Sequence, residues 1–274
     1  PADVWTTVAR ERVASVQIVG DAFARPLIDE LHRHSYDLSA LRFIVSGGAV
    51  LSAVNKQALL DLVPGVQVID IVGSSEAGRQ GVHTSSTRSG AATGSFGPSA
   101  GATVLDDART AELAPGTGAI GWLASAGRVP LGYLGDPDKT RATFPVIGGS
   151  RYSVPGDRAR RAADGSIELL GREAVCINTG GEKVFAEEVE QVLKAHPAVV
   201  DALVVGRPSE LWGQEVVAVV HLRAPASDDE LRAACAEHLA RYKLPKAIIR
   251  RDAIGRTPSG KPDYTWAKTQ VSGQ

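Results

Sequence analysis

The sequence predicts an α/β protein with two domains, and three stretches of different pattern support this. Residues 1–100 alternate short apolar strands with amphipathic helices, the pattern of a parallel sheet in a three-layered α/β domain. Residues 101–170 contain short strands separated by turn residues, which predicts a small antiparallel sheet or barrel. Residues 171–274 mix helices and strands over the usual size of a compact α+β domain. The length of 274 residues and the hydrophobic content of 43% leave room for two domains.

In the first stretch, helix and strand signals follow one another regularly. The expected elements are helix 5–12, strand 15–19, helix 22–33, strand 43–45, helix 52–62 and strand 66–71. Asp21 and Ser52 stand just before two of these helices and are residue types that cap a helix N-terminus. Four apolar residues share the inner side of the helix after Ser52, namely Val54, Ala58, Leu59 and Leu62.

The second and third stretches are separated near residues 170–172. Residues 83–102 are rich in Ser, Thr and Gly, and we expect an exposed loop there. The turn pairs Asp106-Asp107, Pro115-Gly116 and Asp164-Gly165 then separate short strands. Beyond the boundary, the expected elements are helix 187–195, strands 199–205 and 216–222, helix 228–241 and strand 247–250.

Composition excludes several classes of protein. The formal net charge of −1 gives no sign of a nucleic-acid or membrane-surface partner. Cys176 and Cys235 stand in neither a paired nor a metal-ligand spacing, which is typical of a reducing compartment. No apolar run reaches the ~18 residues of a transmembrane helix, so we expect a soluble, cytoplasmic protein. The chain lacks methionine and begins at Pro1 with a helical pattern, so we expect a piece of a longer protein.

One segment, GREAVCINTGGEKVFAEEVE at 171–190, has an unusually specific pattern. A β-prone run precedes the adjacent glycines Gly180 and Gly181, and acidic residues open a helix near Glu187. Adjacent glycines permit positive φ and a close approach of the backbone to another molecule, and acidic residues favour a helix N-terminus. On these grounds the segment is either a ligand-facing strand, glycine turn and helix, or an ordinary connection.

The segment resembles the hinge and core motif of the adenylate-forming acyl-CoA synthetases. The fitting residues are Gly171, Arg172, Gly180, Gly181, Glu182, Glu187, Glu188, Val189 and Glu190, and the resemblance extends from about Leu41 to Lys261. It implies that 1–170 is part of an N-terminal adenylation domain and that 171–274 is the complete, mobile C-terminal domain. The implied activity joins a small-molecule carboxylic acid to AMP with ATP and Mg²⁺, then transfers the acyl group to coenzyme A. The residues of 152–157 and 178–188 look most similar to those of actinobacterial fatty-acid and steroid side-chain CoA ligases.

A polar turn follows the strand that ends at Val72 and Gly73. Ligands of open α/β sheets bind at the carboxyl ends of strands, where Ser74, Ser75 and Glu76 offer hydroxyls and a carboxylate to a phosphate and its Mg²⁺. Without the resemblance, these residues are equally a simple polar turn. The resemblance implies that Glu76 binds Mg²⁺ and that Ser75 contacts the α-phosphate or the acyl carboxylate. It also implies that Val72 packs on adenine, where the family usually has an aromatic ring.

The resemblance implies further nucleotide contacts at Gly47, Gly48, Ala49, Asp70, Asp157 and Arg172. The first three line the adenine pocket with backbone, and Asp70 accepts a hydrogen bond from the adenine amino group. A carboxylate has two acceptor oxygens, which suits Asp157 to the two ribose hydroxyls, with the Arg172 guanidinium near the ribose and phosphates. The alternatives are a strand-to-helix turn at 47–49 and an Asp in a Pro-Gly turn.

Lys261 stands in the Ser-Gly-Lys context in which the family has its adenylating lysine. The resemblance implies that the C-terminal domain rotates near Arg172, so that one orientation inserts Lys261 and the other presents Gly180-Gly181. The pivot departs from the family, since Ala174 and Val175 stand where Asp or Lys is common.

A looser group is similar to the residues with which some relatives hold the nucleotide end of coenzyme A. It contains Trp212, Tyr242, Lys243 and Lys246. Core packing for Trp212 and plain surface charge for the lysines are the alternatives.

Two other functions stay open from the sequence. The family's glycine-rich phosphate loop is not found in this chain, so the chain alone is expected to be inactive or impaired, or a non-catalytic fragment. The longer protein is alternatively an adenylating enzyme that delivers its acyl group to a carrier protein.

Overall fold

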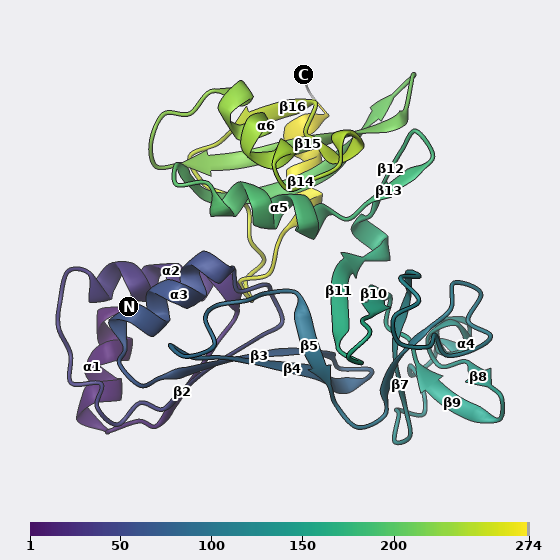
Figure 1. Cartoon of the computed structure of the whole chain (residues 1–274), viewed down its shortest axis with the longest axis horizontal. Coiled ribbons are helices and arrows are strands. Elements are labelled where there is room, and N and C mark those ends of the chain that lie inside the picture. Colours follow the sequence, from purple (N-terminus) through teal and green to yellow (C-terminus); the bar gives the residue numbers. More distant parts are fainter. Residues whose placement is uncertain (273–274) are drawn as a thin grey trace. The chain divides into compact units, whose positions relative to one another are not determined.

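The computed structural model describes residues 1–272 and divides into two compact units, Pro1–Leu169 and Leu170–Gln274. Figure 1 shows helices and sheets in both units, which confirms the predicted α/β class. No helix of the described residues is long and apolar enough to cross a membrane.

The first unit begins with the predicted alternation of helix and strand. Its opening elements are α1 (Ala2–Arg10), β1 (Ser15–Ile18), α2 (Gly20–Leu31), β2 (Phe43–Gly47), α3 (Ala53–Leu62) and β3 (Gln67–Ser74). The three strands lie side by side in the order β1-β2-β3 and run parallel. Trp5 is fully buried in the core of this part, and its indole Nε1 donates a 2.9 Å hydrogen bond to the carbonyl of Leu27, which holds α1 against α2.

Of the two predicted helix caps, one is confirmed and one is wrong. The Ser52 side chain accepts a hydrogen bond from Asn55 N and caps α3. Asp21 lies inside α2, which begins at Gly20, and its Oδ1 accepts hydrogen bonds from Ser52 N at 2.8 Å and from Asn55 Nδ2 at 2.8 Å. The carboxylate therefore satisfies the start of α3 and joins the two helices.

The inner face of α3 also differs from the prediction at one position. Val54 is 51% exposed, while the buried residues of the helix are Asn55, Lys56, Leu59 and Leu60. Two polar side chains are buried here because each has a polar partner, Asp21 for Asn55 and Asp70 for Lys56. A pattern based on apolar residues alone does not detect such a face.

The predicted exposed loop at 83–102 is wrong in part. The chain turns after β3 into β4 (Gly78–Ser85), which runs antiparallel to it with Asp70 opposite His83, and then into β5 (Ser95–Pro98). Ladder hydrogen bonds come from the backbone, so a run of Ser, Thr and Gly can form strands when a neighbouring strand supplies the partners.

The antiparallel part continues the same sheet. Its elements are β6 (Ala102–Leu105), β7 (Gly121–Ala126), α4 (Pro137–Thr143), β8 (Val146–Ile147), β9 (Ser150–Ser153), β10 (Asp157–Arg161) and β11 (Ile167–Arg172). The path runs β1-β2-β3-β4-β5-β11-β10-β7-β9-β8, with β6 beside β7. The small antiparallel sheet is thus an extension of the parallel one, and it does not form a closed barrel.

The second unit has its own five-stranded sheet. After a short 3-10 helix at Glu173–Val175, its elements are β12 (Ile177–Thr179), β13 (Glu182–Val184), α5 (Ala186–Ala195), β14 (Val199–Ser209), β15 (Gly213–Leu222), α6 (Asp228–Ala236), β16 (Ala247–Arg250) and α7 (Tyr264–Val271). The sheet order is β13-β12-β15-β14, and β16 pairs parallel with β15. Because β13 lies between the glycine turn and α5, the expected direct passage from turn to helix is wrong.

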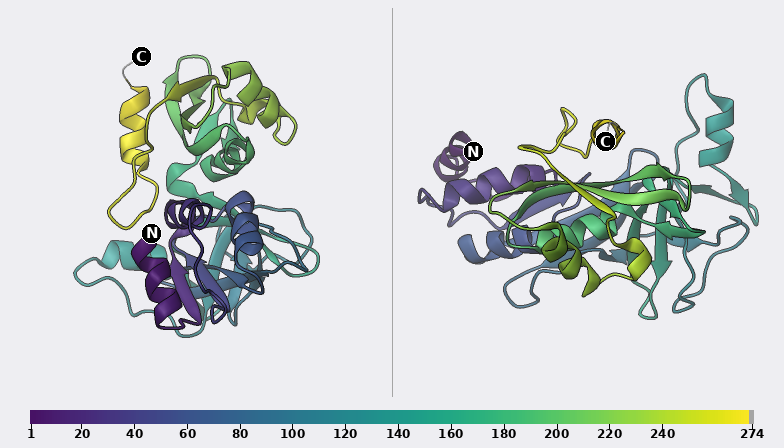
Figure 2. Two further views of the ribbon diagram at one scale, coloured as in Figure 1. Left: turned by 90° about the vertical axis from the view of Figure 1, so that its left-hand side faces the viewer. Right: turned by 90° about the horizontal axis from the view of Figure 1, so that it is seen from above.

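Side chains of β14 and β15 alternate between two cores. Val204 and Ala218 pack with Val189 and Leu231 from α5 and α6, while Leu203 and its neighbours pack with α7. Figure 2 (left) shows α7 on one side of this sheet and α5 and α6 on the other. The unit therefore has three layers, with the sheet in the middle.

Candidate functional site

The carboxyl ends of β2 and β3 form the first part of the candidate site. The two strands are parallel neighbours, with Gly47 opposite Ile71, so both end at one edge of the sheet. A Cβ at Gly47 would lie 3.4 Å from the carbonyl oxygen of Ile71, and Gly48 has a φ of 82°. The small residues predicted to line a nucleotide pocket, Gly47 to Ala49, therefore allow a tight turn directly beside β3.

Asp70 and Val72, both on β3, have partners within the chain. The ammonium of Lys56, on a fully buried side chain, contacts Asp70 Oδ2 and Ala92 O and donates a 3.2 Å hydrogen bond to Thr93 Oγ1. Burial raises the pKa of Asp70, while the charge of Lys56 opposes this rise. Val72 is 9% exposed in a core cluster with Phe96. The adenine contacts of both residues stay predictions.

Glu76 lies in the turn between β3 and β4, where its carboxylate is held by a residue that the sequence analysis missed. The hydroxyl of Tyr133 donates a 2.7 Å hydrogen bond to Glu76 Oε1, and this bond lowers the pKa of Glu76. Lys139 Nζ lies 3.9 Å from the centroid of the Tyr133 ring. No motif in the sequence around Tyr133 indicates this contact, because Tyr133 and Glu76 are 57 residues apart in the chain.

The Ser74 hydroxyl also interacts with the Glu76 carboxylate and helps to lower its pKa, and such a carboxylate fits a Mg²⁺ ion that also binds phosphate oxygens. Mg²⁺ is usually held by one or two carboxylates together with phosphates and water. Among residues 1–272, no group of three or more His, Cys, Asp and Glu side chains could hold a metal ion by itself. Glu76 would thus be a ligand only together with a bound nucleotide.

Asp157 begins β10 after a Pro155-Gly156 turn in which Gly156 has a φ of 109°. Its side chain is mostly buried, at 8% exposure. The next residue, Arg158, forms an ion pair with Asp107 at 2.6 Å and stacks over the Trp122 ring at 4.1 Å. These contacts of Arg158 fix the backbone beside Asp157, whose predicted ribose contact stays a prediction.

In the second unit, Glu187 organises the backbone at Gly171 and Arg172. Glu187 Oε1 accepts a 3.3 Å hydrogen bond from Arg172 N, and a Cβ at Gly171 would lie 2.3 Å from Glu187 Oε2. Gly171 also has a φ of 146°, which favours glycine. The Gly-Arg pair is therefore fixed to the first turn of α5, ahead of Ala174 and Val175 in the short 3-10 helix.

The glycine turn of this unit has the backbone that its sequence predicts. Gly180 and Gly181 have φ values of 58° and 86° and join β12 to β13. Gly180 N donates a 3.0 Å hydrogen bond to Trp212 O, and a Cβ at Gly180 would lie 3.0 Å from Trp212 Cε3. Trp212 is 47% exposed, so the core-packing alternative is wrong.

The basic residues near this turn differ in their surroundings. Lys243 Nζ donates hydrogen bonds of 2.7 Å to both carboxylate oxygens of Glu188, so it is not plain surface charge. Lys246 is exposed, and its backbone N–H pairs with Val216 O beside β15.

Lys261 lies at the end of an exposed loop with strong internal hydrogen bonding. Thr257 N donates to Lys261 O at 2.9 Å, and Lys261 N donates to Thr257 Oγ1 at 3.1 Å. Arg256 and Pro262 form an isolated β-bridge at the base of the loop. The Lys261 side chain is thus exposed on a loop whose two ends are joined by this bridge.

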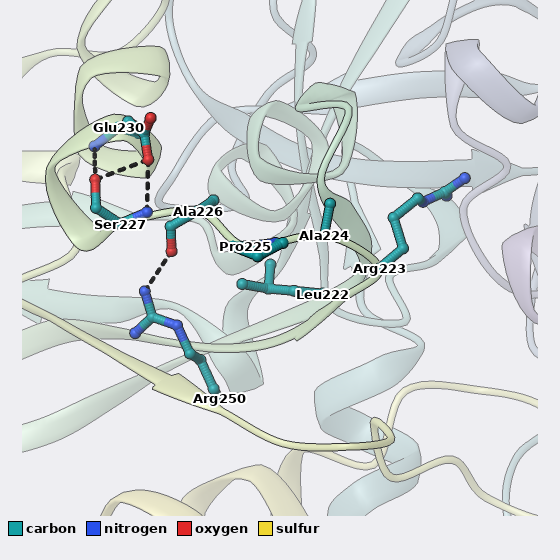
Figure 3. Close-up of a pocket in the computed structure, with 8 residues that line it drawn as sticks. All are labelled: Leu222, Arg223, Ala224, Pro225, Ala226, Ser227, Glu230 and Arg250. Carbon is teal, nitrogen blue, oxygen red and sulfur yellow. Dashed lines mark hydrogen bonds between the residues drawn. The ribbon is translucent and has the colours of Figure 1, made fainter.

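A surface pocket of the second unit contains none of the predicted site residues. It is lined by Leu222, Arg223, Ala224, Pro225, Ala226, Ser227, Glu230 and Arg250 (Figure 3). Three of its polar side chains already have partners, since Arg250 Nη2 donates to Ala226 O at 2.7 Å, Glu230 Oε2 accepts from Ser227 N at 2.6 Å, and the Ser227 hydroxyl donates to Glu230 Oε2 at 2.8 Å.

Known proteins are similar to this chain in both sequence and fold. Residues 188–261 match the family described as the AMP-binding enzyme C-terminal domain. The chain is 54% identical to the medium-chain acyl-CoA ligase Mig of Mycobacterium avium, over 98% of the chain and 49% of the relative. The resemblance to the second half of the adenylate-forming acyl-CoA synthetases is confirmed. A 3-oxocholest-4-en-26-oate–CoA ligase of Rhodococcus rhodochrous is 46% identical over 98% of the chain and 50% of the relative.

The chain spans about half the length of these curated relatives. Among solved structures, the amide bond synthetase McbA from Marinactinospora thermotolerans is similar, with a TM-score of 0.83 and 27% identity over 99% of this chain and 56% of that chain. ATP-bound MatB from Rhodopseudomonas palustris, at 24% identity and a TM-score of 0.83, shares the fold over 100% of this chain and 53% of that chain.

The predicted site residues are divided between the two units of the structure. Gly47, Gly48, Ala49, Asp70, Val72, Gly73, Ser75, Glu76 and Asp157 belong to the first unit, and Arg172, Gly180, Gly181, Trp212, Lys246 and Lys261 belong to the second. Within the first set, the structure brings the ends of β2 and β3 together. Within the second, it brings Gly180 onto Trp212. Lys56 and Tyr133 are additions from the structure, and Glu187, already part of the motif, gains a contact with Arg172 N.

Proposed function

We propose that this chain is part of an ATP-dependent acyl-CoA synthetase, called here the full-length synthetase. In its first step, a carboxylate oxygen attacks the α-phosphorus of ATP, and the bond to the bridging oxygen breaks to release pyrophosphate. In its second step, the thiol sulfur of coenzyme A attacks the acyl carbon, and AMP leaves. The 54% identity to a medium-chain acyl-CoA ligase over nearly the whole chain is the observation that carries this proposal.

The first unit contributes the nucleotide and magnesium contacts of the proposed reaction. Glu76 would hold Mg²⁺, and Ser75 would contact the α-phosphate or the acyl carboxylate. When bound, Mg²⁺ neutralises part of the phosphate charge. The hydrogen bond from Tyr133 supports this role, because it keeps the Glu76 carboxylate ionised and oriented. Gly47, Gly48, Ala49, Asp70, Val72, Gly73 and Asp157 would contact the adenosine.

The second unit contributes a different group to each step. Lys261 would place its positive charge between the acid carboxylate and the α-phosphate, two anions that otherwise repel each other. Arg172 would bind the ribose and phosphates. Gly180 and Gly181 would face the acyl-adenylate in the thioester step, with Trp212 and Lys246 near the nucleotide of coenzyme A. The positive φ values of the two glycines support a backbone made for close approach.

The substrate of the full-length synthetase is a fatty acid or a steroid side-chain acid. The names of two similar relatives, a medium-chain acyl-CoA ligase and a 3-oxocholest-4-en-26-oate–CoA ligase, support this class. A panel of medium-chain, long-chain and steroid acids, assayed for acid-dependent AMP formation with coenzyme A, tests it. Activity on amino acids alone would contradict it. A cytoplasmic location is part of the proposal, since no disulfide joins Cys176 to Cys235.

The 274-residue chain by itself is expected to be inactive. It spans about half the length of its relatives and contains no recognisable glycine-rich phosphate loop. The test is acid-dependent exchange of radioactive pyrophosphate into ATP, with the purified chain beside the full-length synthetase. Robust exchange by the chain alone would refute this part of the proposal.

A second candidate function differs only in the acceptor of the acyl group. The similarity to an amide bond synthetase at 27% identity shows that related folds serve other products. In this alternative, the acyl-adenylate is delivered to a carrier protein or another nucleophile. Release of free acyl-CoA by the full-length synthetase supports the first function, and transfer to a carrier protein without any acyl-CoA supports the second.

A further inference from the structure

Five titratable side chains form a partly buried charge network in the second unit. It consists of Glu190, Lys194, Asp201, Arg256 and Tyr264, from α5, β14, the loop after β16 and the start of α7. Lys194 Nζ lies 3.6 Å from Asp201 Oδ1 and 4.0 Å from Glu190 Oε2. Arg256 contacts Asp201 Oδ2 through Nη2 and through Nε, the latter at 3.2 Å.

The carboxylates of this network are held by charge and by backbone donors. Glu190 Oε1 accepts a 2.9 Å hydrogen bond from Val204 N, and Asp201 Oδ1 accepts one of 2.9 Å from Ala202 N. Burial acts to raise the pKa of Asp201, but the charges of Lys194 and Arg256 outweigh it and lower that pKa. Asp201 is therefore a negative charge held on the central sheet.

Arg256 is the member of the network that reaches the Lys261 loop. It forms the β-bridge with Pro262 that closes this loop, and Thr257, the residue after Arg256, bonds Lys261 through both backbone and side chain. The side chains of Arg256 and Asp201 are 16% and 19% exposed, so their contact is largely shielded from water. One carboxylate on β14 thus holds the base of the loop.

We infer that Arg256, held by Asp201, is a positioning residue that fixes the Lys261 loop on the second unit and so supports the adenylation step. The inference rests on the proposed role of Lys261. A planar guanidinium donates two hydrogen bonds in a fixed direction, which a lysine at the same position cannot do. A loop without this anchor places its lysine less accurately, and an error of about 1 Å in a reacting group can lower a rate about 100-fold.

The first readout of the test is the loop itself, in the 274-residue chain. Arg256→Gln is compared with Arg207→Gln, because Arg207 forms a similar pair with Glu215 at 2.7 Å, with 24% and 22% exposure. Hydrogen–deuterium exchange of the backbone amides of residues 257–261 is followed by mass spectrometry under native conditions. We expect about tenfold faster amide exchange for Arg256→Gln and Asp201→Asn and no change for Arg207→Gln, since amide exchange tracks local opening. Equal amide exchange in all variants overturns the inference.

The second readout separates the two half-reactions in the full-length synthetase. Arg256→Gln is expected to lower acid-dependent pyrophosphate exchange between about tenfold and 100-fold, while thioester formation from supplied acyl-adenylate is unchanged. Arg256→Lys restores the charge without the fork and should recover only part of the exchange. An equal loss in both half-reactions overturns the inference. If the unmodified synthetase shows no pyrophosphate exchange at all, the proposed function fails, and hydrogen exchange of the loop amides still decides whether Arg256 anchors the loop.

Discussion

The hydroxyl of Tyr133 and the carboxylate of Glu76 form a 2.7 Å hydrogen bond between the 131–136 loop and the β3–β4 turn. Because the Tyr133 hydroxyl donates to one carboxylate oxygen, it lowers the pKa of Glu76, and the Glu76 carboxylate stays ionised at lower pH than that of an ordinary Glu. Outer residues that orient a metal-binding carboxylate commonly matter for both affinity and rate.

Tyr133→Phe in the full-length synthetase should therefore weaken its response to Mg²⁺. A hydrogen bond to a charged group contributes about 1.5–3 kcal/mol, so half-saturation should need about tenfold or more Mg²⁺. The pKa of Glu76 should rise toward its ordinary value, which moves the acidic limb of the adenylation rate to higher pH. Both effects are measured by pyrophosphate exchange as a function of Mg²⁺ concentration and pH.

The chain offers a matched control for this substitution. Tyr152 donates a 2.9 Å hydrogen bond to Glu112 Oε1 in the same unit, and neither residue belongs to the candidate site. Tyr152→Phe should leave the Mg²⁺ and pH profiles of the synthetase unchanged. If the two variants behave alike, the special role of the Tyr133–Glu76 bond is refuted.

Lys261→Ala in the full-length synthetase should abolish adenylation and spare the thioester step from supplied acyl-adenylate. The reason is that only the first step brings two anions together. The measurements are pyrophosphate exchange and acyl-CoA formation, with the exposed Lys268 of α7 changed to Ala as the control. An equal loss of both steps would leave the two-orientation scheme without residue-level support.

Lys56→Met should destabilise the first unit by about 3–5 kcal/mol, because it leaves the Asp70 carboxylate buried without its charged partner. Burial already raises the pKa of Asp70, and loss of Lys56 should raise it further. A carboxyl with a raised pKa in the folded state is neutral at low pH, and stability is lost as the pH rises through that pKa. The variant should thus be less impaired at pH 4.5 than at pH 8.

Urea unfolding of the 274-residue chain at the two pH values measures this effect. Lys56→Met combined with Asp70→Leu removes both charges and should recover much of the lost stability. A loss for Lys56→Met that does not depend on pH would show that Asp70 is not the group left without a partner.

Gly180→Ala and Gly181→Ala form a second matched pair. Both positions have positive φ, which costs an alanine about 1–2 kcal/mol, but only at Gly180 would the new Cβ meet a side chain, Trp212. Gly180→Ala should therefore be the more destabilising, as measured by thermal unfolding of the chain. Adding Trp212→Ala should remove the difference in stability between the two variants. If the difference persists, the destabilisation comes from the backbone alone and not from the Trp212 contact.

The sequence predicts the parts of this fold that depend on repetition. Alternating apolar runs indicate the strands of the first unit, Ser52 marks the start of α3, and paired glycines mark the β12–β13 turn. The helix cap at Asp21 and the inner face of α3 were predicted wrongly for a different reason. Asp21 and Lys56 are explained by partners 31 and 14 residues away along the chain, respectively Ser52 and Asp70, which local patterns do not contain.

The candidate site shows the same division. Residues in contiguous motifs, such as Ser75-Glu76 and Gly180-Gly181, were named from the sequence. The residues that hold Glu76 and the Lys261 loop in place, Tyr133 and Asp201, act from distant segments of the chain. β4 was missed for a related reason, since backbone pairing with β3 needs no apolar pattern.

Strand β14 connects two of these features, since Asp201 lies near its start and Trp212 follows its end. One end is fixed by the ion pair to Arg256 and the other by the contact with Gly180. A one-residue insertion or deletion within β14 would turn the remaining side chains to the opposite face of the sheet and displace one of these two contacts. Changes of length in this unit should therefore be tolerated in connections such as 223–227, and not between Asp201 and Trp212.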